Sequence, residues 1–231
     1  MSTNSHIPVL FQNQDFVVID KPEGLNVHSE DSAGLVVLLK QQLAVEELYP
    51  VHRLDKMTSG LMLFALNKST AQTFQRLFEA HEVQKYYLAI SDQKPKKKQG
   101  TIKGDMLPAR RGSWKLAKSN DNPAITRFVS VSVQPGERLF LLKPVTGRTH
   151  QIRVALKSIS APICGDERYA SAEVAKHEDR GYLHAYAVEF ELFSEHYRFV
   201  CKPEHGRRFL SPQCRHKIEE WWAPWDVFSK A

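Results

Sequence analysis

The sequence predicts an α+β fold in which a mixed, mostly antiparallel central sheet is flanked by helices and loops. Segments with strand patterns outnumber segments with helical spacing, and the two kinds do not alternate regularly, as they would in a doubly wound sheet. No internal repeat and no long Gly/Ser/Pro linker divides the 231 residues, of which 42% are hydrophobic and 25% charged. We therefore expect one globular domain over residues 1–231.

The first half of the chain predicts two strands, each followed by a helix. Residues 16–20 and 60–66 have the pattern of short buried strands, and a Pro and a Gly that favour a turn follow the first of them. Ser32 is suited to cap a helix that continues to Tyr49, with leucines on one face. Ser69 is suited to open a second helix, because apolar residues recur after it at helical spacing.

Strands dominate the second half of the chain. Residues 126–133 partly alternate between polar and apolar side chains, which is typical of a half-exposed strand, and residues 138–143 are expected to pair with it antiparallel. Thr149 is suited to cap a helix that runs to about Ser158. The other expected strands are residues 85–91, 182–193 and 196–201, the last two as a hairpin. We expect the tail, residues 204–231, to be helical.

Composition excludes several classes of protein. The longest uninterrupted apolar run, residues 61–66, is far too short to span a bilayer. The N-terminus lacks a basic region followed by an apolar stretch, so we expect no secretory signal. The three cysteines include no Cys-x-x-Cys pair and cannot form a disulfide framework. A reducing cytoplasm is therefore the expected compartment.

Positive charge is concentrated in one segment. Residues 94–118 contain nine basic side chains and one acidic side chain, so the remainder of the chain has a net charge of −2 within a total of +6. Such a local excess is typical of a patch that contacts a polyanion. A solvated, Lys-rich loop is an equally good interpretation of this run taken alone.

The densest polar cluster, residues 52–60 (His-Arg-Leu-Asp-Lys-Met-Thr-Ser-Gly), directly precedes a predicted buried strand. A loop held by a rigid strand is a common place for catalytic groups, and Asp55 is suited to act there as a base or a nucleophile. Charged loops are common, so from these residues alone a surface Arg–Asp pair followed by a turn is the more frequent interpretation.

A second cluster, residues 146–153 (Thr-Gly-Arg-Thr-His-Gln-Ile-Arg), opens a predicted helix. A helix N-terminus flanked by Arg148 and Arg153 favours an anion, either a phosphate or a carboxylate. The alternative is a capped surface helix with solvated arginines. If Asp55 meets Arg153, the pair would keep that carboxylate ionised and oriented.

The ordered set of motifs resembles the RluA-type pseudouridine synthases. The matching segments are residues 19–28 (Ile-Asp-Lys-Pro-Glu-Gly-Leu-Asn-Val-His), 52–55 with 58–60, 85–89 (Lys-Tyr-Tyr-Leu-Ala), 142–153, Gly165-Asp166 with Tyr169, and 183–185. Together they span about residues 9–203. The resemblance implies the pseudouridine synthase fold with an active-site cleft across the sheet. It also implies conversion of uridine in RNA to its C5-glycoside isomer, which requires no redox cofactor and no metal because nothing is oxidised or hydrolysed overall.

The resemblance implies a role for each matched side chain. Asp55 is the essential carboxylate, and the sequence leaves open whether it attacks C1′, adds to C6 of the base or removes a C2′ proton. Arg153 is its expected ion-pair partner. Tyr87 is expected to lie against the uracil and accept the C5 proton, although a phenol with a pKa of about 10 is a poor base at neutral pH. Ile152 is expected to wall the pocket, so that the detached uracil stays in place.

RNA is the expected partner, with no membrane and no obligate protein partner, and we expect a monomer. A base within a stem must be flipped out, and by the match an arginine next to the motif histidine contacts RNA near the vacated position. The charge of residues 94–118, and not the motifs, adds three lysines as phosphate contacts. The residues expected to contact RNA are therefore His52, Arg53, Arg148, Lys96, Lys97 and Lys98.

The chain departs from the family pattern in places. The first motif begins about fifteen residues in, so we expect no N-terminal S4 module, and Ala155 follows Arg153-Val154 where the family usually has His. The His-Pro expected in the last hairpin is missing as well. A loose Cys/His set (Cys201, His205, Cys214, His216) fits no common zinc spacing. Three C-terminal tryptophans are expected to pack a terminal helix more readily than to stack on bases.

Alternatives remain at the level of function. The RNA substrate is either a ribosomal-RNA hairpin or a transfer-RNA stem-loop, and residues 77–85 resemble the relatives that modify transfer RNA. A catalytically silent RNA-binding or RNA-chaperone protein on the same scaffold is the main rival. A hydrolase that uses His52 and Asp55 ranks last, because no nucleophile–base–orienter set accompanies them.

Overall fold

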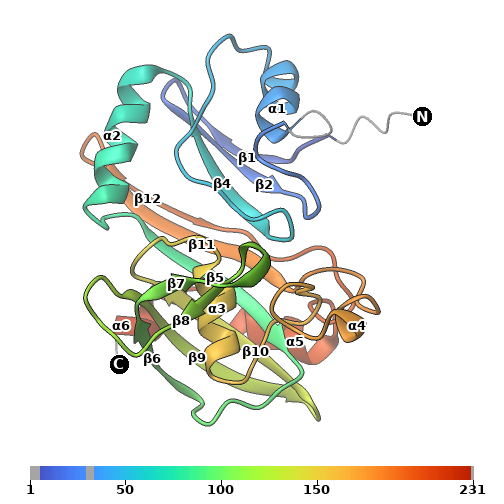
Figure 1. The fold of residues 1–231 in the computed structure, drawn as a ribbon. Helices are drawn as coiled ribbons and strands as arrows, with labels where there is room; N and C mark the ends of the chain where they lie inside the picture. The colour runs from blue at the N-terminus through green and yellow to red at the C-terminus, as the bar shows by residue number, and fades with distance from the viewer. Residues whose placement is uncertain (1–5, 30–33, 230–231) are drawn as a thin grey trace.

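The computed structural model describes residues 6–29 and 34–229, and one mixed sheet runs through it (Figure 1). Its strands are β1 (Val9–Gln12), β2 (Phe16–Lys21), β3 (Tyr49–Pro50), β4 (Ser59–Ala65), β5 (Gln84–Ser91), β6 (Gln99–Gly104), β9 (Ala124–Gln134), β10 (Glu137–Pro144), β11 (Leu183–Leu192) and β12 (Glu195–Val200). Their order is β1-β2-β4-β11-β5-β10-β9-β6, with β12 paired to β11 and β3 to β4. Strands β4 and β11 run parallel and the other pairs are antiparallel, which confirms the predicted sheet.

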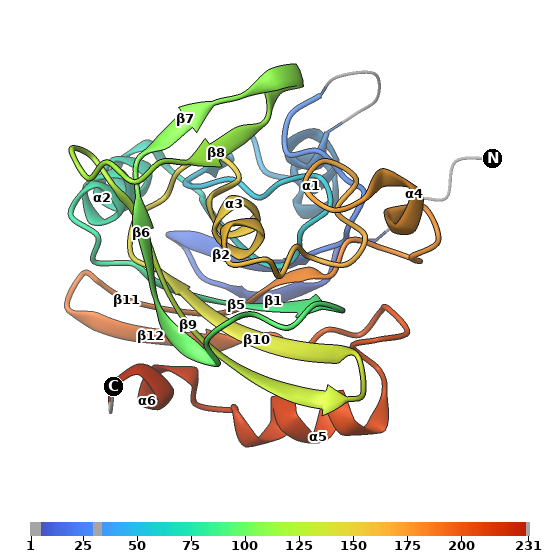
Figure 2. The same ribbon diagram turned by 60° about the horizontal axis from the view of Figure 1, so that its bottom comes forward.

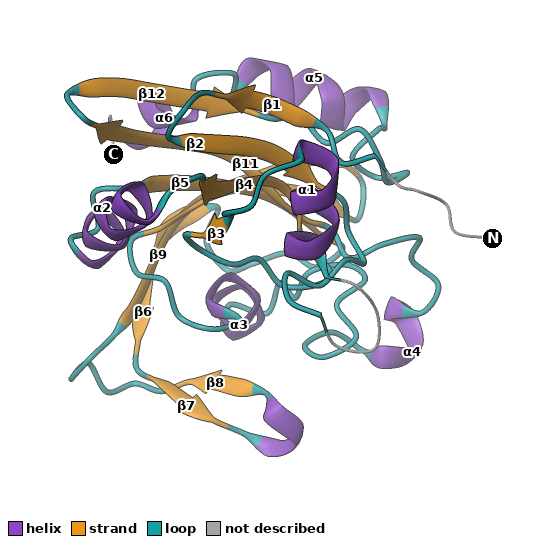
Figure 3. Ribbon diagram, turned by 90° about the horizontal axis from the view of Figure 1, so that it is seen from above, coloured by secondary structure: helices purple, strands orange, loops and turns teal. Residues whose placement is uncertain are grey.

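Helices cover both faces of this sheet. They are α1 (Leu35–Leu43), α2 (Lys68–Glu79), α3 (Gln151–Ser158), α4 (Ala172–Ala175), α5 (Pro212–Glu220) and α6 (Pro224–Ser229). Helix α3 lies on one face, while α5 and α6 lie across the other (Figure 2). A separate hairpin, β7 (Met106–Pro108) and β8 (Trp114–Leu116), stands beyond α3 and away from the main sheet (Figure 3).

Two apolar clusters stabilise the fold and meet at β11. One cluster joins β1, β2 and β4 to α1 and α2, and the other joins β5, β9 and β10 to α3 and the C-terminal helices. Strand β11 contributes Tyr186 to the second cluster and Phe190 to the first, both of them buried. The junction of the two clusters is therefore a fully packed strand, which is a rigid base for a cleft.

The parallel contact between β4 and β11 depends on Gly60. Its φ is +101°, and a Cβ at this position would lie 2.3 Å from the carbonyl oxygen of Ala185. Both the left-handed backbone and the close approach of β11 exclude a side chain. Because the Asp55 loop leads directly into β4, this contact sets where that loop meets the second half of the molecule.

The predicted helix limits are corrected at three points. Helix α1 ends at Leu43, before a left-handed Ala44, and Tyr49 belongs to β3; Ser32 lies outside the described residues. Asn67, not Ser69, caps α2, because its side chain accepts from the amide of Thr70 at 2.8 Å. Thr149 does not cap α3, which begins after His150.

The basic segment is the largest departure from the expected elements. Residues 94–118 are not one Lys-rich loop, because they form β6 and the β7–β8 hairpin. In β6 the side chains are mostly exposed, so no apolar alternation marks the strand. Backbone pairing with β9 stabilises it instead.

The tail predicted as helical over 204–231 is helical in α5 and α6, but residues 204–211 are not, and the two helices pack onto the sheet. Trp221 is buried, and the Tyr186 hydroxyl donates to the carbonyls of Ile218 and Trp221, both at 3.2 Å. Cys201 and Cys214 are buried in different clusters. In the part of the chain that the structure describes, no three His, Cys, Asp or Glu side chains gather as a metal site. No helix among the described residues is long and apolar enough to cross a bilayer.

Candidate active site

Asp55 lies on a turn that a buried lysine supports. The amide of Thr58 donates to the carbonyl of Asp55 at 2.9 Å, which closes the turn. Lys21, at the end of β2, is fully buried and donates through Nζ to the carbonyl of Thr58 at 2.8 Å. Burial lowers the pKa of Lys21 to about 8, and the nearby charges of Glu23 and Asp55 limit that fall. Lys21 thus ties the turn that carries Asp55 to the end of β2.

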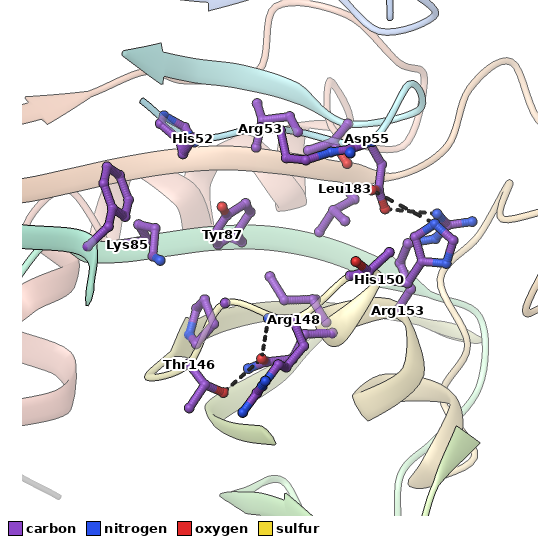
Figure 4. A pocket seen from close by; sticks show the side chains of 18 of the residues that line it. His52, Arg53, Asp55, Lys85, Tyr87, Thr146, Arg148, His150, Arg153 and Leu183 are labelled. Atoms are coloured by element: carbon purple, nitrogen blue, oxygen red, sulfur yellow. Dashed lines mark hydrogen bonds and ion pairs between the residues drawn. The ribbon is translucent and has the colours of Figure 1, made fainter. Parts of the chain in front are cut away.

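Arg153 contacts Asp55 across the cleft. Its Nη1 lies 2.8 Å from Oδ2 of Asp55, so the ion pair predicted from the two motifs is present (Figure 4). The side chain projects from the first turn of α3 and is itself buried. These two residues are 98 positions apart in the sequence, and the tertiary fold brings them into contact.

Asp166 orients Arg153 and was given no role by the motif match. Its two carboxylate oxygens accept from Nε and Nη2 of Arg153 at 2.7 and 2.9 Å, a two-point contact that fixes the guanidinium plane. Burial alone would lower the pKa of Arg153, but the hydrogen bonds and charge of Asp166, aided by Asp55, raise it above its ordinary value. The sequence signal was the Gly165-Asp166 pair.

The ion pair lines a cavity of about 590 Å³ that also contains Tyr87. Tyr87 and Lys85 project from β5, Ile152 from α3 and Leu183 from β11, and together they form its walls (Figure 4). A cavity of this size, with apolar walls from Ile152 and Leu183 among many polar and charged groups, suits a small planar polar ligand. Lys85 and Leu183 belong to matched motifs but were not predicted as lining residues.

Tyr87 faces the cavity in its un-ionised form. Burial, and to a smaller extent the charge of Asp55, raises the pKa of Tyr87 above its ordinary value of 10. Its hydroxyl has no hydrogen-bond partner among residues 6–29 and 34–229. The phenol is therefore available to a bound group, while the phenolate is disfavoured.

His52 lines the same cavity but has a backbone partner. Its Nε2 accepts from the amide of Leu63 at 3.0 Å, and its ring lies against Phe78 with centroids 5.4 Å apart. Burial, and then the charge of Lys85, lowers the pKa of His52 to about 3. The ring is neutral at physiological pH and ties the loop to β4, which leaves no free ring acceptor at Nε2 for RNA.

The predicted basic contacts divide into two groups. Arg53 and Arg148 are exposed at the first cavity, where Arg148 bonds to Asn122. Arg53 also lines a second cavity, of about 1140 Å³, which includes Arg110 and Arg111 at the tip of the β7–β8 hairpin. Lys96, Lys97 and Lys98 are exposed but line neither cavity. They precede β6, at the end of that strand remote from the hairpin.

Comparison with known proteins places the sequence within one family. The family model for RNA pseudouridylate synthase matches residues 15–158, more than half of the chain. A Haemophilus influenzae protein named as an RNA pseudouridine synthase is 49% identical over 214 residues, covering 92% of this chain and 95% of that protein. The ribosomal large subunit pseudouridine synthase C of Rickettsia bellii is 33% identical over 77% of this chain.

The chain spans only part of several relatives: 61% of the Rickettsia protein and 47% of RNA pseudouridine synthase 7 of Oryza sativa. Among solved structures, human RNA pseudouridylate synthase domain containing 4 matches with a TM-score of 0.72 and 26% identity, over 92% of this chain and 93% of that one. Human RNA pseudouridylate synthase domain containing 1 shares the fold, with a TM-score of 0.75 at 24% identity over 88% of this chain and 86% of that one. By the family model and the identity to whole relatives, this chain belongs to the RNA pseudouridylate synthase family and is an isomerase.

Proposed function

We propose that this protein isomerises specific uridines of a structured RNA to pseudouridine, with Asp55 as the essential carboxylate and without a cofactor. The observation that carries the proposal is the Asp55–Arg153 contact of 2.8 Å in a cavity that Tyr87 also lines. The reaction rearranges one glycosidic bond without net oxidation or hydrolysis. Acid–base and covalent chemistry by side chains is therefore sufficient for it.

Arg153 donates to Oδ2 of Asp55 and so orients the carboxylate for attack on C1′, addition to C6 or removal of the C2′ proton. Each of these roles needs a carboxylate oxygen held at a fixed position. After the N1–C1′ bond breaks, the uracil has to turn without leaving. Ile152, Leu183 and the Tyr87 ring supply apolar walls for that step.

The RNA strand is proposed to enter with the target uridine flipped out of its stack. Arg53 is suited to contact the opened helix, since it is exposed and borders both cavities. A planar guanidinium stacks on a base and hydrogen-bonds a phosphate at once, which offsets part of the cost of unstacking. In this proposal His52 does not contact RNA through Nε2, because that atom accepts from the amide of Leu63. His52 instead stabilises the loop that carries Arg53 and Asp55.

Ribosomal RNA is the proposed target, in the cytoplasm. The support is that relatives from Rickettsia and Vibrio vulnificus are named ribosomal large subunit pseudouridine synthase C. The test is position-by-position mapping of pseudouridine in total RNA from cells with and without the gene. Loss of one ribosomal site names the substrate, and loss of a transfer-RNA site replaces the proposed target. No lost site would favour a silent RNA-binding protein.

Replacing Tyr87 with Phe is expected to slow a step after glycosidic cleavage by about tenfold or more, with RNA affinity changed less than about twofold. The ring and its packing remain, but the oxygen that in its deprotonated form would take the C5 proton is lost. Quench-flow measurement of single turnovers, with cleaved and rearranged products counted separately, checks the result. Unchanged rates for both steps would leave Tyr87 as a stacking residue alone.

The basic residues are expected to differ in their effect on RNA binding. Changing Arg110 and Arg111 to Gln should weaken binding and lower the slope of log K against log salt by about one unit per lost contact. The same change at Lys96, Lys97 and Lys98 tests the prediction made from charge alone. Filter binding between 50 and 300 mM salt checks both variants. An unaltered slope for the triple variant would make those lysines a solvated surface.

A further inference from the structure

His150 has a strained backbone directly beside the catalytic pair. Its φ of +58° and ψ of +18° place it in the left-handed region immediately before α3. For a residue with a side chain this conformation costs about 1 kcal/mol, so it persists only where the surroundings impose it. It turns the imidazole toward Asp55, and His150 lines both cavities (Figure 4).

Hydrogen bonds define which ring nitrogen of His150 carries the hydrogen. The amide of Trp114, in β8, donates to the Tyr169 hydroxyl at 3.0 Å. That hydroxyl lies 2.9 Å from Nδ1 of His150. No other acceptor for its hydrogen is found in the described part of the chain, so Tyr169 donates to Nδ1. The hydrogen of the neutral ring is therefore on Nε2.

The hydrogen-bearing Nε2 faces the second oxygen of Asp55. It lies 4.0 Å from Oδ1, whereas Arg153 holds Oδ2. At this distance the two atoms are not hydrogen-bonded in the free protein, and catalytic hydrogen bonds often tighten only when the substrate is bound. Burial lowers the pKa of His150, opposed by Asp55 and Asp166 and reinforced by Arg153 and Arg168. The ring is accordingly neutral at pH 7.5.

We propose that His150 is a positioning residue that orients Asp55 through Nε2–H, and that the Tyr169 hydroxyl acts through His150 by fixing its tautomer. The inference rests on the proposed function, in which Asp55 performs the chemistry. Two donors on two oxygens fix the plane of a carboxylate, while one donor leaves it to rotate about that contact.

A chain of contacts leads from the β7–β8 hairpin through Tyr169 and His150 to the carboxylate of Asp55. The hairpin is tied to the loop after Asp166 twice, by the Trp114–Tyr169 bond and by Nη1 of Arg168 on the carbonyl of Arg111 at 2.6 Å. Its tip lines the second cavity. The backbone amide of Trp114, in a strand near the proposed RNA path, therefore orients the Tyr169 hydroxyl. That hydroxyl in turn fixes the tautomer of His150.

A double-mutant cycle tests the proposal with His150→Asn, Tyr169→Phe and the double variant. Asn tolerates the left-handed backbone but cannot span from Tyr169 to Asp55, and Phe keeps the ring packed on Arg153. Each single variant is expected to lower the single-turnover rate constant at saturating RNA by about tenfold, with Kd for RNA changed less than about twofold. The double variant should be no slower than His150→Asn.

Tyr186→Phe is the matched control, because it removes a buried tyrosine hydroxyl on the other side of the sheet. It should retain the wild-type rate constant. Multiplying effects in the double variant, or a wild-type rate for either single variant, would overturn the proposal. If His150→Asn does not fold, Tyr169→Phe alone tests the proposal. A lower rate constant with an unchanged Kd for RNA supports it, and a wild-type rate constant contradicts it.

Asp55→Asn, assayed alongside, separates this proposal from the proposed function. A wild-type rate for Asp55→Asn would contradict both the proposed function and the positioning role of His150. Loss of turnover in Asp55→Asn combined with wild-type rates for His150→Asn and Tyr169→Phe removes only the positioning role.

Discussion

Asp55→Asn is expected to lower the single-turnover rate constant by at least about 10⁴-fold, the order seen when an essential catalytic side chain is removed. The amide has the shape of the carboxylate but neither its charge nor its nucleophilicity. Arg153 keeps its two bonds to Asp166, so the cavity should hold its form. The loss should appear in the rate constant at saturating RNA, with Kd changed by less than about threefold.

A matched control is Asp226→Asn, an exposed position on α6 across the sheet from the cleft. Its rate constant should equal that of the wild type. Measurement uses excess enzyme over RNA, with pseudouridine counted at each time point. If Asp55→Asn retained more than about one tenth of the wild-type rate, the carboxylate would have no essential role.

Arg153→Met should cost both activity and stability. Removing the guanidinium leaves Asp166 buried without its ion partner, for which about 3–5 kcal/mol of unfolding free energy is the usual loss. Asp55 loses its orienting donor at the same time, so we expect the rate constant to fall by about 10² to 10³. Urea unfolding at pH 7.5 and single-turnover kinetics at 15 °C measure the two effects separately.

Adding Asp166→Asn to Arg153→Met separates the two losses. The second change removes the buried charge but keeps an oxygen that accepts from the amides of Arg168 and Tyr169. We expect this double variant to regain about half of the lost stability or more, because no uncompensated buried charge remains. Its rate should stay low, since Oδ2 of Asp55 still lacks the Arg153 donor. Full recovery of the rate would contradict the orienting role of Arg153.

The strands that could be predicted are those with a local pattern. Residues 16–20 and 60–66 are mostly apolar because they correspond closely to β2 and β4, whose residues are buried on both faces. The strand over 126–133 and its antiparallel pairing with β10 are confirmed, but the polar Thr126 and Ser130 lie on the buried side of β9, and the alternating valines are only half-buried. Strand β6 escaped prediction because its exposed side chains have no apolar period.

Helix starts were harder to predict because capping depends on side-chain geometry and not only on residue type. Ser69 and Thr149 have suitable hydroxyls, but Asn67 caps α2 instead. Before α3, His150 takes the N-cap position and no side chain caps the helix. The Gln151 side chain accepts from the amide of Arg148 at 3.0 Å, a bond that stabilises the turn before the helix.

The candidate site was partly readable from motifs. Asp55, Tyr87 and Arg153 were chosen from the sequence, and they line one cavity. The two-point contact of Asp166 with Arg153 was not predictable, because a Gly-Asp pair does not reveal its partner. The charge count over 94–118 likewise did not separate Arg110 and Arg111, which line a cavity, from the lysines before β6.

The sequence by itself determined the α+β class, the family and the side chains able to do chemistry, because apolar periods and motif spacing are local properties of the chain. Only the tertiary structure decided which of those side chains meet. Asp55 reaches Arg153 beside the point where β4 lies parallel to β11 at Gly60, and the left-handed backbone of His150 turns its ring toward Asp55. Contacts between distant segments follow from how strands and helices pack, and that packing is set by both apolar clusters at once.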